Sequence, residues 1–213
     1  MINQYYTLGT RGKAGWEEKK SLFIGNAFPA ESEADAQEFI NKIKAQYNDA
    51  RHHVYAYVTG LDNEIQRFSD DGEPVGTGGR PVLEVIKNCR LKNSVIVVTR
   101  YFGGILLGTG GLIRAYGKAA ALAVKSGEII KKVLCRKTNI VIEYGELGKV
   151  QNFLAQADCR IKNISYTDKV MIICYIEIDR LGQVEKRLNE LCRGSGEIIF
   201  GENSYETVGL NKE

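Results

Sequence analysis

The chain has 213 residues, of which 44% are apolar and 26% charged, and its formal net charge is +3. This size suits one large domain or two small ones, and the composition is that of a globular protein. No apolar run approaches the roughly 20 residues that span a bilayer, and the N-terminus lacks the basic and apolar regions of a secretory signal. We therefore expect no membrane contact and a cytoplasmic location.

The first part of the chain alternates β-rich runs with segments of helical periodicity. Ala36, Phe39, Ile40 and Ile43 have helical spacing, and Ser32 is suited to cap that helix. We expect strands over 21–28, 53–59, 65–68 and 94–99, and helices over 31–47, 80–88 and 111–126.

The second part of the chain shows a different order of elements. Its patterns predict a strand, a helix, two strands, a helix and a strand, over 139–144, 147–156, 160–166, 170–178, 181–192 and 197–200. This β-α-β-β-α-β order is that of a ferredoxin-like fold. We therefore expect an α+β protein with a first domain over 1–133 and a second over 134–213, joined by a strand through residues 131–136.

The five cysteines are odd in number and form no Cys-x-x-Cys pair, and the two histidines are adjacent. This pattern argues against a disulfide scaffold or a zinc finger, and we expect reduced, mostly buried thiols. Lys and Arg outnumber Asp and Glu by 18 to 14 up to Leu134, whereas the ratio is 11 to 12 beyond it. An anionic partner should therefore prefer the first domain.

Two glycine-rich runs, 76–79 and 108–111, precede predicted helices. Backbone amides at a helix start attract anions, and arginine follows each run, at Arg80 and Arg114. Neither run is a Walker A loop. Phosphate binding and tight strand-to-helix packing both remain open.

The acidic run with Asp70, Asp71 and Glu73 has two interpretations. The carboxylates could hold a metal or serve as acid and base, with His52 as a partner, or they could cap a turn. We favour the turn, with a histidine hydrogen-bonded to it, because adjacent side chains in extended backbone point to opposite sides.

The segment Arg100–Gly104 ends a predicted buried strand. Its arginine and aromatics could bind phosphate and stack on a base. Alternatively, the aromatics belong to the core and Arg100 pairs with Asp70, Asp71 or Glu73. The two interpretations are compatible.

These motifs resemble the YigZ/IMPACT family. The resemblance rests on Ala50-Arg51-His52, Ala56-Tyr57, Ser69–Pro74, Gly76-Thr77 with Gly79, Arg100–Gly104, Leu107–Leu112 and Arg114-Ala115-Tyr116. It implies a first domain with a ribosomal protein S5 domain 2-like fold and a ferredoxin-like second domain, similar to domains IV and V of elongation factor G. It also implies an interaction with RNA or the ribosome, linked to translational regulation.

We expect a binding protein rather than an enzyme, and we assign no catalytic residue, cofactor or metal. The residues predicted to contact nucleic acid or phosphate are Arg67, Arg80, Arg100, Tyr101, Gly110, Gly111, Arg114 and Lys118. The motif residues His52, Asp70, Asp71 and Glu73 could be structural or functional. One alternative is a hydrolase or transferase acting on a phosphorylated small molecule or nucleotide, and another is a protein–protein adaptor that uses the ferredoxin-like sheet.

Overall fold

The computed structural model describes residues 2–62 and 64–208, which form two compact units. The first unit comprises Tyr5–Lys131, and the second comprises Lys132–Val208 together with residues 2–4. The units therefore divide after Lys131, whereas the predicted domain boundary follows Val133. None of the helices in the described ranges has the length and apolarity that crossing a bilayer requires.

The first unit is built on a five-stranded antiparallel sheet with strand order β2-β3-β6-β4-β5. Because side chains alternate between the two faces of a strand, the central strands β4 and β6 supply residues to two cores. The strands are β2 (Gly12–Glu18), β3 (Ser21–Pro29), β4 (His52–Thr59), β5 (Ile65–Ser69) and β6 (Ser94–Tyr101).

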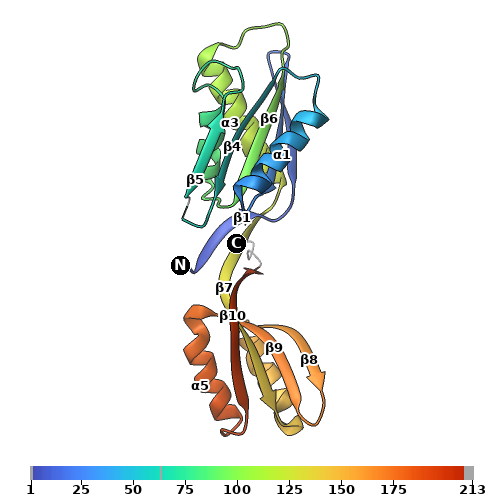
Figure 1. Cartoon of the computed structure of the whole chain (residues 1–213), viewed down its shortest axis with the longest axis vertical. Coiled ribbons are helices and arrows are strands. Elements are labelled where there is room, and N and C mark those ends of the chain that lie inside the picture. Colours follow the sequence, from blue (N-terminus) through green and yellow to red (C-terminus); the bar gives the residue numbers. More distant parts are fainter. Residues whose placement is uncertain (1, 63, 209–213) are drawn as a thin grey trace. The chain divides into compact units, whose positions relative to one another are not determined.

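Helices cover both faces of this sheet (Figure 1). Helices α2 (Gly79–Asn88) and α3 (Gly108–Ser126) pack on one face, around a core that includes Phe23, Val54 and Tyr116. Helix α1 (Glu33–Gln46) packs on the other face, around Tyr57, Val95 and Val97. Below, these are called the α2/α3 face and the α1 face.

The predicted cap of α1 is confirmed, since Ser32 accepts a hydrogen bond from the Asp35 amide and Asp35 bonds back to the Ser32 amide. Helix α3 begins at Gly108, three residues earlier than predicted. Glycine has low helix propensity, so the sequence pattern does not predict a helix over the glycine-rich residues 108–110. In the structure, the later turns of α3 pack in the core, and the helix extends back to Gly108.

The second unit contains the predicted β-α-β-β-α-β order, and its strand order β10-β7-β9-β8 is ferredoxin-like. Strand β7 also pairs with β1 (Gln4–Leu8). Both helices contribute to one core with β7 and β9, so they share a face of the sheet. The elements are β7 (Ile129–Ile142), α4 (Leu147–Gln156), β8 (Arg160–Tyr166), β9 (Val170–Glu177), α5 (Leu181–Leu191) and β10 (Glu197–Val208), with 3-10 turns η1 (Tyr144–Glu146) and η2 (Ile178–Arg180). The protein is thus α+β.

Candidate functional site

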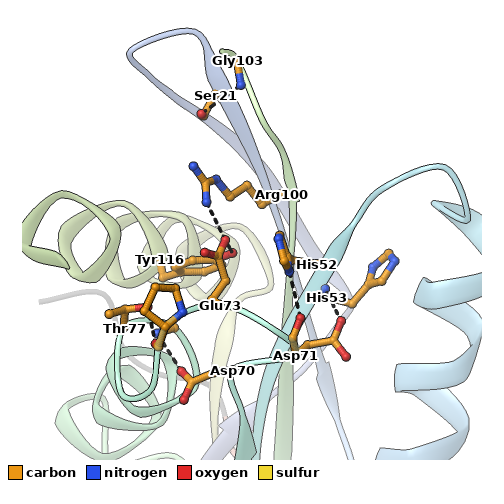
Figure 2. Close-up of polar contacts among 12 residues, drawn as sticks. Ser21, His52, His53, Asp70, Asp71, Glu73, Thr77, Arg100, Gly103 and Tyr116 are labelled. Carbon is orange, nitrogen blue, oxygen red and sulfur yellow. Dashed lines mark hydrogen bonds and ion pairs between the residues drawn. The ribbon is translucent and has the colours of Figure 1, made fainter. Parts of the chain in front are cut away.

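Asp70 holds the first glycine-rich run in place (Figure 2). Its carboxylate accepts hydrogen bonds from the amides of Gly76, Gly78 and Gly79 at 2.8, 2.9 and 2.8 Å. The last two amides lie at the start of α2, where backbone donors have no partner within the helix. A Cβ on Gly79 would lie 2.8 Å from the Ser69 backbone. The anion at the start of α2 is therefore the chain's own Asp70, and the glycines allow the close approach.

Asp71 joins the acidic turn to β4 and α1. Its carboxylate accepts from the His53 amide at 2.7 Å and pairs with Lys44 Nζ at 3.1 Å. Its carbonyl lies 2.8 Å from His52 Nδ1, which is the expected bond between a histidine and the acidic turn. Asp70 and Asp71 thus bind different groups, and no cluster of three metal-ligating side chains is found within residues 2–62 and 64–208.

His53 lies on the opposite face of β4 from His52. It is buried, and its Nδ1 is 3.1 Å from Thr99 Oγ1. Burial lowers the pKa of His53 below its ordinary value of 6.5, although the nearby Asp71 opposes that shift. The imidazole therefore favours the neutral form in the folded protein.

Glu73 and Arg100 form a buried ion pair on the α2/α3 face. Arg100 Nη1 donates to Glu73 Oε1 at 2.6 Å, and the Tyr116 hydroxyl donates to the same oxygen at 2.7 Å (Figure 2). Burial, followed by the bond to Glu73, raises the pKa of Tyr116. The Arg100 guanidinium lies 5.5 and 5.4 Å from the rings of Phe23 and Phe102. With only 6% of its surface exposed and its guanidinium bound to Glu73, Arg100 is not accessible to an external phosphate.

Tyr101 is positioned by another acid on the α1 face. Strand alternation places it opposite Arg100, and its hydroxyl donates to Asp49 Oδ1 at 2.6 Å. That hydrogen bond is the main cause that raises the pKa of Tyr101 to about 12. Tyr101 is therefore on a different face from the cations of α3.

Arg67 is also separated from the other predicted cations. It is exposed on the edge strand β5 and pairs with Tyr57, whose side chain belongs to the core under α1. Residues directly opposite each other on neighbouring strands point to the same face of the sheet, so Arg67 lies on the α1 face. Arg80, Arg114 and Lys118, by contrast, are exposed on the two helices of the α2/α3 face. Of the two predicted glycines at the start of α3, Gly110 has open space where a Cβ would lie, whereas a Cβ on Gly111 would lie 3.0 Å from the Leu107 side chain.

The helices on the two faces differ in charge. Helices α2 and α3 carry five bases, Arg80, Lys87, Arg114, Lys118 and Lys125, against one acid, Glu84. Helix α1 carries three acids, Glu33, Asp35 and Glu38, against two bases, Lys42 and Lys44. A cationic surface therefore lies on the α2/α3 face.

The prediction missed Lys19 and Lys20, which form the turn between β2 and β3. Both have positive φ, at 46° and 66°, as a two-residue hairpin turn of type I′ requires. In the sequence, the only indication of this turn is a pair of adjacent lysines before a β-rich run. The pattern of β2 is weak, so the sequence does not show that a strand precedes the lysines and that they form a hairpin turn.

Comparisons with known proteins match both units. Residues 19–124 match the Impact N-terminal domain, and residues 140–195 match a domain of unknown function, DUF1949. The chain is 40% identical to the IMPACT family member YvyE of Bacillus subtilis, over 99% of this chain and 97% of that one. It is 34% identical to the IMPACT family member YigZ of Escherichia coli, over 86% and 91%. A crystal structure of a hypothetical protein matches with a TM-score of 0.62 and 31% identity, over 95% of this chain and 99% of that one.

Proposed function

Because the chain belongs to the IMPACT family, we propose that it is a cytoplasmic protein that binds structured RNA or the ribosome and regulates translation. The phosphate contacts are made by the cationic surface of α2 and α3, with Arg80, Arg114 and Lys118 at its centre. Exposed lysines and arginines bind nucleic-acid phosphates and release counterions as they do so.

The charge difference between the helices on the two faces of the first unit carries this proposal. In the acidic turn, Asp71 is paired with Lys44 and Glu73 with Arg100, so these two charges are balanced within the protein. Asp70 accepts from three amides and keeps its charge. Helices α2 and α3 themselves carry a single acid, Glu84. The exposed charge on α2 and α3 is therefore predominantly positive. An extended phosphate backbone is the partner that such a surface attracts.

The enzyme alternative has weaker support from the same geometry. His52, Glu73 and Arg100 do converge near the acidic turn (Figure 2). However, Glu73 and Arg100 neutralise each other in the interior, and His52 Nδ1 is bonded to a backbone carbonyl. A catalytic acid or base needs access to its substrate, and the buried ion pair does not provide it.

Co-sedimentation with ribosomes, together with filter binding to ribosomal RNA at low salt, tests the proposal. We expect binding by the wild type, weaker binding by Arg114→Ala and Lys118→Ala, and near-wild-type binding by Lys149→Ala, which removes an exposed lysine from α4. Each substitution that removes a phosphate-binding cation should lower the slope of affinity against salt by about 1. If the wild type bound neither ribosomes nor RNA, the proposed function would be wrong.

A further inference from the structure

The loop between β6 and α3 presents aliphatic side chains to solvent. Leu106 is 83% exposed and Ile105 is 42% exposed. Their neighbours Gly104, Gly108 and Gly110 have no atom within 4 Å of where a Cβ would lie, so the backbone of this stretch also lies in open space. An apolar side chain held away from the protein loses the stabilisation that burial gives it.

The base of this loop is nevertheless anchored. A Cβ on Gly103 would lie 2.1 Å from the backbone of Lys20, so the loop packs directly on the β2–β3 turn. The Gly103 amide donates to Ser21 Oγ at 3.1 Å, and Figure 2 shows these two residues side by side. The ring of Phe102 lies over the Arg100 guanidinium. The loop therefore starts at a fixed place on the turn, at Gly103, and α3 begins at Gly108 on its other side.

Cations flank these aliphatic side chains. Lys19 and Lys20 are exposed in the turn on which Gly103 packs, and Arg114 is exposed on the second turn of α3, directly after the loop. Glu17 and Glu18 precede the turn; Glu17 alternates to the α1 face, and Glu18, which is half-buried, is on the α2/α3 face. The tip, defined as Lys19, Lys20 and Phe102–Leu107, thus combines an apolar centre with a basic border.

We propose that this tip docks on double-helical RNA, with Ile105 and Leu106 against the minor groove and the cationic side chains on the flanking phosphates. This inference rests on the proposed function and specifies the class of RNA. The minor groove of A-form RNA is wide and shallow enough to be contacted by protein. In DNA, leucine and isoleucine are among the side chains that proteins insert between base steps from the minor groove.

Duplex RNA fits the tip better than single strands do. Single-stranded RNA is bound by stacking its bases on exposed aromatic rings. In this tip the most exposed side chain is the aliphatic Leu106, at 83%. The ring of Phe102 is 56% exposed, but it lies over the Arg100 guanidinium. Tyr101 faces the other side of the sheet, with its hydroxyl bonded to Asp49.

A bilayer is the weaker candidate for the same surface. Ile105 and Leu106 contain less hydrocarbon than a single myristoyl chain, which by itself holds a protein only marginally at a membrane, and the ring of Phe102 is held over Arg100. We therefore favour a nucleic-acid phosphate backbone over a lipid bilayer as the partner of the cations of the tip.

The experiment measures binding of the full chain to an RNA duplex of about 16 base pairs, to one of its strands, and to vesicles of phosphatidylserine and phosphatidylcholine. We expect the duplex to bind at least about tenfold more tightly than the single strand and the vesicles. Leu106→Ser should weaken duplex binding about tenfold without changing its salt dependence, because it removes apolar contact and no charge. Val75→Ser is the matched control, since Val75 is a fully exposed aliphatic side chain on the other glycine-rich loop.

The outcomes separate this inference from the proposed function. If Arg114→Ala weakens RNA binding while Leu106→Ser does not, RNA binding stands and the role of the tip is wrong. Equal losses in Leu106→Ser and Val75→Ser, a preference for the single strand, or a preference for vesicles would each overturn the inference as well. If no RNA or ribosome is bound at all, the proposed function fails and this inference fails with it. Because Leu106 is solvent-exposed, we expect Leu106→Ser to leave the melting temperature unchanged. A thermal melt followed by circular dichroism will show that the variant is folded.

Discussion

The ion pair between Glu73 and Arg100 gives the sharpest prediction about the first unit. Both side chains are buried, the two charged atoms are 2.6 Å apart, and Tyr116 donates to the same carboxylate oxygen. Glu73→Ala leaves a buried guanidinium without its counter-charge, and breaking a buried pair in this way costs about 3–5 kcal/mol of unfolding free energy. Glu73→Gln keeps a neutral acceptor for both donors, so we expect a smaller loss of about 2 kcal/mol.

Urea denaturation followed by circular dichroism measures these losses. Glu190→Ala is the control, because it removes a surface pair with Arg187 in which both partners are about half exposed, and it should cost about 0.5 kcal/mol or less. The double variant Glu73→Leu with Arg100→Met removes both charges and should recover most of the stability. A loss below about 1 kcal/mol for Glu73→Ala, or no recovery in the double variant, would refute the argument that charge burial dominates here.

Three further predictions concern the turns and the buried histidine. Asp70→Ala removes the acceptor of three amides and should cost about 1–2 kcal/mol, whereas Asp70→Asn should retain most of the stability; equal losses in urea denaturation would contradict the capping role. Gly103→Ala should destabilise the protein strongly, since its Cβ would overlap the Lys20 backbone, whereas Gly110→Ala, in open space, should leave the melting temperature nearly unchanged or higher. Because the pKa of His53 is lowered, the unfolded state binds the proton more tightly, and unfolding free energy should fall as the pH drops below about 6.5. In His53→Gln this fall should be smaller between about pH 7.5 and 5.5, and an identical pH profile would show that His53 is not its source.

Local patterns predicted the elements that have strong periodicity or clear ends. Ser32, the helical spacing from Ala36 to Ile43, and the β-branched run of β6 each indicate structure without help from distant residues. Strand β2 was missed because Gly12–Glu18 contains two glycines and only one large apolar residue, Trp16. It is held by pairing with β3, and a single sequence does not reveal that pairing.

The site was less predictable than the fold because its geometry depends on register. The sequence offered Asp70, Asp71 and Glu73 as partners for Arg100, and only the folded chain selects Glu73. Similarly, Arg67 and Arg80 looked equivalent in sequence. The pairing of Arg67 with Tyr57 places it on the α1 face, whereas Arg80 lies on α2. A residue's face in a sheet changes with a shift of one position in register.

The exposed loop between β6 and α3 shows a different limit of the sequence pattern. Ile105, Leu106 and Leu107 form a run of three apolar residues before the predicted helix. In the structure only Leu107 packs against the core, and Leu106 faces solvent. Composition alone does not distinguish an apolar residue that is buried from one that is presented to a partner.

Charge reversal on the two faces of the first unit tests the central claim most directly. The measurement is the affinity of the full chain for ribosomal RNA, and its salt dependence, for the wild type, Arg114→Glu on α3 and Lys42→Glu on α1. We predict that Arg114→Glu weakens binding by about tenfold or more and lowers the salt slope by at least about 1, whereas Lys42→Glu binds like the wild type. Equal effects of the two reversals, or no effect of Arg114→Glu, would contradict the claim that RNA binds on the α2/α3 face.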